Sequence, residues 1–200
     1  MTNYRINLNG LDFVTKQPTA DDYKEYYTSV LFGAFKEESD GQSQQNSLVA
    51  IGKRNVVKVE AEGQEFTAFE KIADDYFARC ATASLEIECD LIETDDPFAV
   101  FTADTVTYKL KNPHTKDEWF ITVKTKNNAL QKRFEGQSIN TEKVNSNKWL
   151  RGQIENLIGK RVDLFNEIKT DAQGYENNEI PLQHMIRVLG VHFFVERRKN

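Results

Sequence analysis

The sequence predicts an α+β fold, with a mostly antiparallel sheet built from hairpins and three to five helices packed on it. Three observations lead to this expectation. The runs 104–112 and 118–126 alternate apolar and polar residues with the two-residue period of half-buried strands. An Asn9-Gly10 pair joins two further alternating runs, and this pair favours a tight hairpin turn. Apolar residues elsewhere recur at helical spacing.

Length and composition limit the classes of protein to which the chain can belong. Its 200 residues, 39% of them hydrophobic, suit a single domain over 1–200. Within that domain we expect a mobile loop over 36–47 and consider a C-terminal lobe over 137–200. The net charge of -5 disfavours a general polyanion binder but allows a local basic face. No run approaches the length of a membrane span, so no membrane partner is expected.

The first part of the chain predicts two hairpins and two helices. Residues 4–16 should form the opening hairpin, and apolar residues at helical spacing predict a helix that ends near Phe35. Residues 48–60 are expected to form a second hairpin around a polar turn. A capping box at Thr67-Ala68-Phe69-Glu70 predicts the start of a helix that continues to about Ala83.

The middle of the chain adds further strands. The segment 85–91 has one apolar face and one acidic face, and the acidic face consists of Glu86, Glu88 and Asp90. A short strand over 98–101 precedes the two alternating runs. If these runs form a hairpin with its loop near His114, the expected cross-strand pairs are Val106 with Val123, Tyr108 with Ile121, and Leu110 with Trp119.

The C-terminal part mixes helical and strand periods. A short helix is expected over 128–135, and another begins near Leu150. Residues 160–168 fit the end of that helix or a separate strand equally well. Residues 170–179 are expected to form a loop, and 185–195, rich in Val and Phe, a central strand. No internal repeat is visible.

The most distinctive predicted chemistry is a basic surface on the outward face of the 104–126 hairpin. Its members are Lys109, Lys111, Phe120, Lys124 and Lys126. Because lysines neutralise phosphates and an exposed ring stacks on a base, this face is a candidate nucleic-acid-binding site. Two simpler explanations stay open. Exposed strand faces carry Lys and Thr for solubility, and the acidic strand would neutralise the lysines if it lay beside the hairpin.

A metal-dependent nuclease is a further alternative. Glu88 and Asp90, with Lys124 or Lys126, could form the carboxylate-plus-lysine site of such an enzyme. The restriction-nuclease-like fold carries a Glu-x-Lys strand, whereas the strand here begins Glu118-Trp119-Phe120, so that motif is absent.

The remaining reactive side chains predict no catalytic residue, metal site or cofactor. His114 fits a turn, and His184 and His192 would lie about 26 Å apart on a strand, too far to share a metal. Cys80 and Cys89 lie on apolar faces and are expected to be reduced thiols. Together with the lack of a signal peptide, this predicts a cytoplasmic location, which includes a host cytoplasm.

Three tyrosines, Tyr23, Tyr26 and Tyr27, crowd one side of the first predicted helix. Core packing is the simpler explanation, and a protein interface is the alternative. Taken together, the patterns favour a non-catalytic structural or assembly protein that acts through protein–protein contacts, with other subunits or copies of itself as partners. A viral (phage-like) particle subunit or assembly factor is its more specific form. Self-association is expected because hairpins offer edges that another chain can extend.

Overall fold

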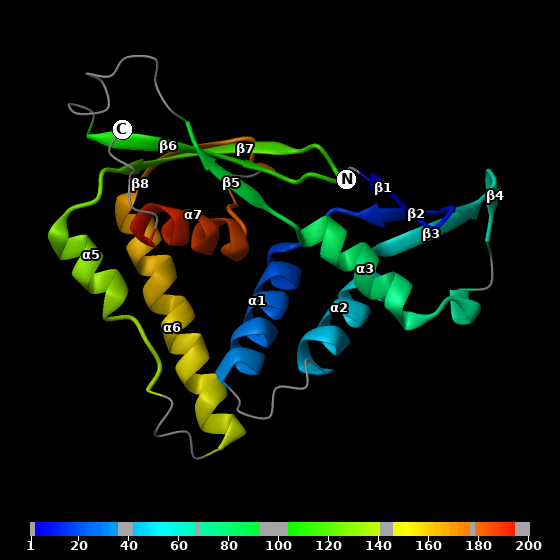
Figure 1. Cartoon of the computed structure of the whole chain (residues 1–200), viewed down its shortest axis with the longest axis horizontal. Coiled ribbons are helices and arrows are strands. Elements are labelled where there is room, and N and C mark those ends of the chain that lie inside the picture. The colour runs from blue at the N-terminus through cyan, green and yellow to red at the C-terminus, as the bar shows by residue number, and fades with distance from the viewer. Residues whose placement is uncertain are drawn as a thin grey trace. The chain divides into compact units, whose positions relative to one another are not determined.

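A computed structural model describes the chain over residues 3–35, 42–66, 69–92, 104–140, 146–176 and 179–194. These residues form two antiparallel four-stranded sheets and six α-helices, which confirms the predicted α+β class (Figure 1). Six helices are one more than the upper expectation.

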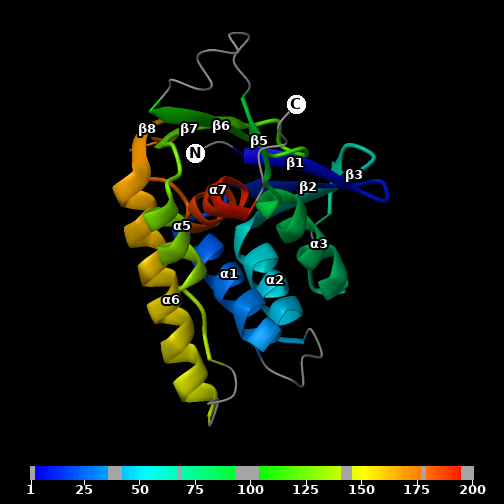
Figure 2. The ribbon, with the colours of Figure 1, turned by 60° about the vertical axis from the view of Figure 1, so that its left-hand side comes forward.

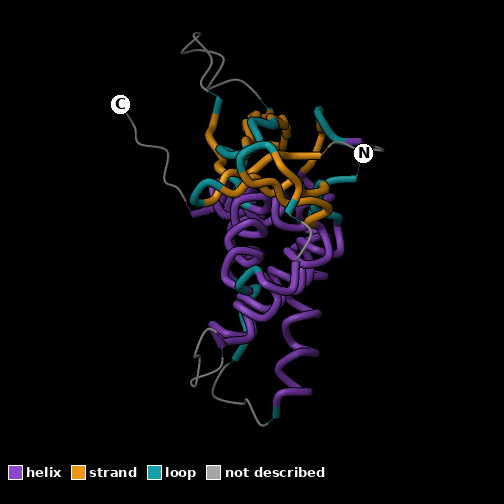
Figure 3. The backbone as a smooth tube through the Cα atoms, turned by 90° about the vertical axis from the view of Figure 1, so that its right-hand side faces the viewer, coloured by secondary structure: helices purple, strands orange, loops and turns teal. Residues whose placement is uncertain are grey.

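The chain divides into two compact units. Unit 1 comprises Met1–Glu86 and Asn112–Asp117, and unit 2 comprises Ile87–Lys111 and Glu118–Asn200. The lobe considered over 137–200 coincides with neither unit, and the single domain stays a prediction. Within each unit the helices lie on one side of the sheet (Figures 2 and 3).

The sheet of unit 1 has the strand order β1 (Asn3–Leu8), β2 (Leu11–Lys16), β3 (Val56–Ala61), β4 (Gln64–Glu65). The predicted opening hairpin is confirmed. Asn9 and Gly10 both have positive φ, 54° and 85°, as a type I′ turn requires. The inner face of this sheet buries Phe13 and Val59 completely.

The helices of unit 1 are α1 (Ala20–Phe35), α2 (Gln42–Asn55) and α3 (Asp74–Leu85). The core of the sheet includes Phe77 and Cys80 of α3. A second cluster joins the three helices through Tyr23, Ile51 and Ala81.

Two predictions for unit 1 are wrong. Residues 42–55 form one helix, where we expected a loop to residue 47 and then a hairpin; residues 36–41 lie outside the described part of the chain. Leu48 and Ile51 are buried one helical turn apart, but the four apolar residues of this segment are consecutive and so could not show that period. The third helix begins at Asp74, after a 3₁₀ turn at Phe69–Lys71, whereas Thr67 of the expected capping box is not described.

The sheet of unit 2 has the order β5 (Glu88–Leu91), β6 (Thr105–Lys111), β7 (Glu118–Lys124), β8 (Lys169–Gln173). The β6–β7 hairpin is confirmed with its predicted register, Val106 with Val123, Tyr108 with Ile121, and Leu110 with Trp119. The strand expected over 98–101 lies outside the described residues.

The helices of unit 2 are α5 (Asn128–Glu135), α6 (Asn147–Ile168) and α7 (Leu182–Phe194). The prediction of α5 is confirmed. Residues 160–168, for which the sequence fitted a helix and a strand equally well, belong to a helix, since α6 continues to Ile168. The loop expected over 170–179 is wrong in its first part, because β8 begins at Lys169 directly after α6.

The central strand predicted over 185–195 is also wrong, because this segment forms helix α7. Val188, Leu189 and Phe193 are buried at helical spacing in the core beneath the sheet. The ring of Phe193 stacks on Phe134 of α5, with centroids 4.8 Å apart. Packing against these neighbours outweighs the strand preference of β-branched and aromatic residues.

The two units share one plan that the sequence does not reveal. Each contains a hairpin, two helices, a strand that starts at the end of the second helix and pairs with the second hairpin strand, and a final helix. The β2–β3 register shifts between Val14 and Thr15, and the β7–β8 register shifts between Thr122 and Val123. These two irregularities occupy the same place in the plan.

The first helix of each unit is capped in the same way. Thr19 Oγ1 accepts the amide N–H of Asp22, and Asn127 Oδ1 accepts that of Leu130, the third residue on in both cases. The capping residue Thr19 is the fourth residue after Thr15, and the capping residue Asn127 is the fourth after Val123. The segment from β2 to the start of α1 therefore corresponds residue by residue to the segment from β7 to the start of α5. The units differ in one added strand each: in unit 2 β5 lies on the outer side of β6, and in unit 1 β4 lies beside β3.

Candidate interaction surface

The predicted basic face exists, but acidic residues lie within it. The strand β5 pairs with β6 so that Glu88 is opposite Lys111 and Asp90 is opposite Lys109. Lys111 Nζ lies 3.0 Å from Glu88 Oε2, and Lys109 Nζ lies 2.6 Å from Glu118 Oε1. The hydrogen bond and the charge of Glu88 raise the pKa of Lys111. Opposite charges on neighbouring strands therefore cancel much of the field of this face.

The other members of the predicted basic face are arranged less favourably for a nucleic acid. Phe120 is half-buried, with Lys109 Nζ 5.9 Å from its ring centroid. Lys124 Nζ donates to the backbone carbonyl of Glu167 at 3.1 Å. Lys126 follows the end of β7 and so lies outside the paired part of the sheet. Only four of the five residues therefore share the face.

The residues of the nuclease alternative do not converge. Asp90 is opposite Lys109, which is in turn opposite Phe120 on β7. Lys124 lies four residues further along that strand, about 13 Å away at roughly 3.3 Å per residue. Over the described ranges, no group of three or more His, Cys, Asp or Glu side chains could hold a metal ion.

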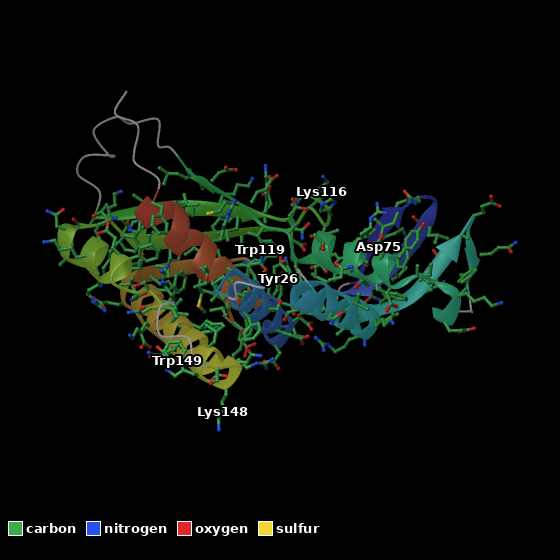
Figure 4. The ribbon with its side chains drawn as sticks, turned by 60° about the horizontal axis from the view of Figure 1, so that its bottom comes forward. Tyr26, Asp75, Lys116, Trp119, Lys148 and Trp149 are labelled. Atoms are coloured by element: carbon green, nitrogen blue, oxygen red, sulfur yellow. The ribbon has the colours of Figure 1, made fainter. Side chains whose placement is uncertain are left out.

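The three tyrosines of α1 have different surroundings. Tyr23 is only 3% exposed and belongs to the helical core of unit 1, and burial raises its pKa. Its assignment to an interface is therefore corrected, and the simpler explanation of core packing applies. Tyr26, labelled in Figure 4, is half-buried and packs against the same core. Tyr27 is also half-buried, so these two stay candidates.

A buried carboxylate that the sequence analysis did not single out connects α1 to α2. Asp22 is 1% exposed and accepts hydrogen bonds from Thr19, Arg54 and Asn55. Burial pushes the pKa of Asp22 upward, but the hydrogen bonds from Asn55, Thr19 and Arg54 outweigh it and hold that pKa below its ordinary value. With its oxygens so engaged, Asp22 acts as a structural link between the helices.

The histidines occupy three separate places. His184 Nδ1 lies 3.0 Å from the hydroxyl of Tyr175, and His192 Nδ1 lies 2.9 Å from that of Tyr108. Both are buried on α7, which corrects their placement on a strand, and each has its own tyrosine. Burial lowers the pKa of His184 to about 3. His114 lies in the β6–β7 loop, as expected of a turn residue.

The exposed large apolar side chains of the described residues are Val57, Leu91, Ile92 and Phe194. Leu91, the last residue of β5, is 37% exposed, and Ile92, which follows it, is 40% exposed; β5 ends its sheet among the described strands. Ile92 continues the β5 ladder by donating its N–H to the carbonyl of Thr107 at 3.0 Å. This outer edge of β5 is the candidate interaction surface of unit 2, and no sequence pattern indicated it, because it depends on which strand ends the sheet.

The fold and this surface define an α+β protein of two similar units. No family model, no curated protein and no solved structure matches the chain. Among the described helices, none has the length and apolar character needed to cross a bilayer.

Proposed function

We propose that this chain is a non-catalytic structural or assembly protein that acts through protein–protein contacts. The observation that carries the proposal is the outer edge of β5. Within the described residues β5 pairs only with β6, so one side of its backbone is open to another chain. Leu91 and Ile92, whose side chains point to opposite faces of the sheet, each add partly exposed apolar surface beside this edge that a partner would bury, at about 25 cal/mol per Å².

The same strand weakens the alternative of nucleic-acid binding. Glu88 and Asp90 of β5 stand beside the lysines that would have to hold phosphates. A nucleic acid on this face would have to displace the Glu88–Lys111 ion pair and approach two carboxylates. A protein partner makes no such demand, because mixed charges are compatible with the polar rim of an interface.

A subunit or assembly factor of a viral (phage-like) particle, made in a host cytoplasm, is the more specific form of the proposal. Each of the two sheets exposes an ion-paired outer face, and such mixed charge is compatible with the polar rim of a contact between subunits. In unit 1, Arg5 lies 2.8 Å from Glu60, and in unit 2 Lys109 pairs with Glu118. The partners would be other subunits or copies of the same chain.

The test is the mass of the native protein as a function of concentration, measured by sedimentation velocity. We expect a defined oligomer, or a stable complex with a co-purifying protein. The double variant Leu91→Lys with Ile92→Lys should shift the measured mass to that of the free chain. Val57→Lys is the control, since Val57 is 42% exposed but lies on β3, in the sheet of unit 1, which does not contain β5.

Several outcomes would contradict the proposal. A chain that sediments as a monomer at high concentration and retains no partner would leave it without support. Salt-dependent binding to single strands, abolished by Lys124→Glu with Lys126→Glu, would favour the nucleic-acid alternative. Cleavage that requires Mg²⁺ or Mn²⁺ and is lost in Asp90→Ala would favour the nuclease.

A further inference from the structure

The shared plan of the two units makes β1 the counterpart of β6. Both are the first strand of the hairpin, and both pair antiparallel with the strand that follows. With β2 aligned on β7, the hairpin registers make Ile6 equivalent to Tyr108 and Leu8 equivalent to Leu110. These four side chains point to the helix-covered side of their sheets, where Ile6, Tyr108 and Leu110 are buried.

The outer edges of these two equivalent strands differ. Beside β6 lies β5, with Cys89 opposite Leu110 and Leu91 opposite Tyr108. Beside β1 the described residues place no strand, so β1 ends its sheet. Unit 2 therefore shows within this same chain what kind of segment the corresponding edge of unit 1 can accept.

The backbone of β1 presents hydrogen-bonding groups to this edge. In a two-residue type I′ hairpin, Leu8 and Leu11 exchange hydrogen bonds across the turn, and bonded pairs then alternate along the ladder. The N–H and C=O groups of Arg5 and Asn7 consequently point away from β2. The equivalent of Arg5 in unit 2 is Thr107, whose carbonyl does accept the N–H of Ile92 from the added strand.

The sequence of β1 suits strand addition. Its six residues contain no proline, and its pairing with β2 shows no bulge. Prolines and bulges are two of the features by which natural proteins protect an open edge. An edge that lacks both is a site for an added strand.

Unit 2 also indicates the chemistry of the added strand. Its inward residues, Cys89 and Leu91, are apolar, and its outward residues Glu88 and Asp90 are acidic beside lysines. On β1 the outward cation is Arg5, whose side chain is 58% exposed. Arg5 already pairs with Asp12 of β2 and, at 2.8 Å, with Glu60 of β3, both on the β2 side. An acidic residue of an added strand would give Arg5 a carboxylate on its open side as well.

We infer that the outer edge of β1 binds an extended segment of a partner protein, added antiparallel, with apolar residues beside Ile6 and Leu8 and an acidic residue beside Arg5. This inference deepens the proposed function and rests on it, since it names a contact through which the chain would assemble.

The probe is a capped synthetic peptide of residues 86–92 of this chain, with Cys89→Val to prevent oxidation and Ile92→Glu to place a carboxylate opposite Arg5. Binding is followed by amide chemical shifts of the ¹⁵N-labelled full chain, a method that detects weak complexes. We expect saturable shifts at Arg5 and Asn7, and at least fivefold weaker binding of the matched peptide with Ile92→Lys.

Two variants of the protein separate the backbone contact from the charge. Arg5→Ala keeps the edge N–H and should bind both peptides equally. Arg5→Pro removes that N–H and should bind at least tenfold more weakly than Arg5→Ala. If Arg5→Pro does not fold, hydrogen exchange of the unmodified protein tests the backbone contact instead. The peptide should protect the amides of Arg5 and Asn7, which point to the open edge, and leave the exchange of the Ile6 amide, which points to β2, unchanged.

The inference is overturned if the peptide produces no saturable shifts, if the shifts lie away from β1, or if Arg5→Pro binds as well as Arg5→Ala. These failures are distinct from failure of the proposed function. A defined assembly without peptide binding at β1 overturns this inference alone. Peptide binding at β1 in a chain that sediments as a monomer supports this inference and counts against self-association through β5.

Discussion

A β-carbon added to Gly52 of α2 would lie 2.1 Å from the carbonyl oxygen of Phe77 in α3. The contact is with the backbone of the neighbouring helix, so no side-chain rotation can relieve it. This glycine is what allows α2 and α3 to cross closely, and the surrounding core, which includes Ile51 and Ala78, is built on that crossing.

Gly52→Ala should therefore destabilise unit 1 by about 3 kcal/mol or more, measured as the free energy of unfolding in urea. Gly159→Ala is the control. Gly159 is exposed on α6, and a β-carbon there would meet nothing within 4 Å. That substitution should stabilise the chain by about 0.5–1 kcal/mol, because alanine favours the helix. Equal effects of the two substitutions would contradict the close crossing.

Asn112 should be the residue of the β6–β7 loop on which stability depends most. Its side chain is 2% exposed, and its Nδ2 donates to the carbonyls of Ala83 and Ser84 at 3.0 Å each. Its Oδ1 accepts the amide N–H groups of His114 and Thr115. Asn112→Ala leaves these buried groups without their partner and should cost about 2–4 kcal/mol.

The control for this loop is a lysine at its tip. Lys116 is exposed (Figure 4), and Lys116→Ala should change the free energy of unfolding by less than about 0.5 kcal/mol. Thermal or urea unfolding of the two variants measures the difference. If Asn112→Ala were as stable as Lys116→Ala, the hydrogen bonds of Asn112 would contribute nothing.

How much the sequence could predict depended on how local the determining interactions are. The β6–β7 hairpin and its register followed from alternation along two adjacent runs, and the hairpin around Asn9-Gly10 followed from its turn residues. Helix α7 could not be predicted in this way. Its residues favour strands locally, and only packing of Phe193 against Phe134 and the sheet makes the helix the better state.

The candidate surface was harder to predict for the same reason. The lysines and the acidic segment were both recognised, but whether they neutralise one another depended on β5 pairing with β6. No local pattern decides which strands become neighbours, because that choice depends on the whole core. That β5 and β1 end their sheets, within the described residues, is a consequence of the same choice.

Stability should fall as the solution is acidified below about pH 6.5, because of His184. This side chain is fully buried between Trp119 and Tyr175, and its pKa in the folded chain is about 3, against 6.5 as its ordinary value. Between these values the unfolded chain binds a proton that the folded chain does not. The free energy of unfolding should therefore decrease by about 1.4 kcal/mol per pH unit from this group, with the full contribution retained above pH 6.5.

Urea unfolding at several pH values from about 7 to 4 measures this slope. His184→Leu removes the titrating group and should flatten the slope, although it also lowers stability at neutral pH by removing the partner of Tyr175. His114→Gln is the control, since it removes an exposed histidine of the loop. A slope that survives in His184→Leu would show that another group causes the acid sensitivity.

Neutralising the acidic residues of β5 should expose the field of the lysines. In the double variant Glu88→Gln with Asp90→Asn, Lys111 loses its ion pair and Lys109 loses its neighbouring carboxylate. The free energy of unfolding should change by less than about 1 kcal/mol, because these groups are exposed. Affinity for single-stranded DNA at low salt should rise above that of the unmodified chain and fall steeply with added salt, because the lysines then meet phosphates without competition from β5, and Glu118 is the carboxylate that still pairs with Lys109.

A matched variant separates the local effect from the change in net charge. Glu155→Gln with Asp163→Asn removes two charges from exposed positions of α6, away from β5. Anisotropy of a labelled oligonucleotide at about 50 and 200 mM salt compares the two variants with the unmodified chain. A gain confined to the β5 variant means that Glu88 and Asp90 suppress nucleic-acid binding on this face. The same gain in both variants attributes it to net charge alone, and strong binding by the unmodified chain contradicts neutralisation across the sheet.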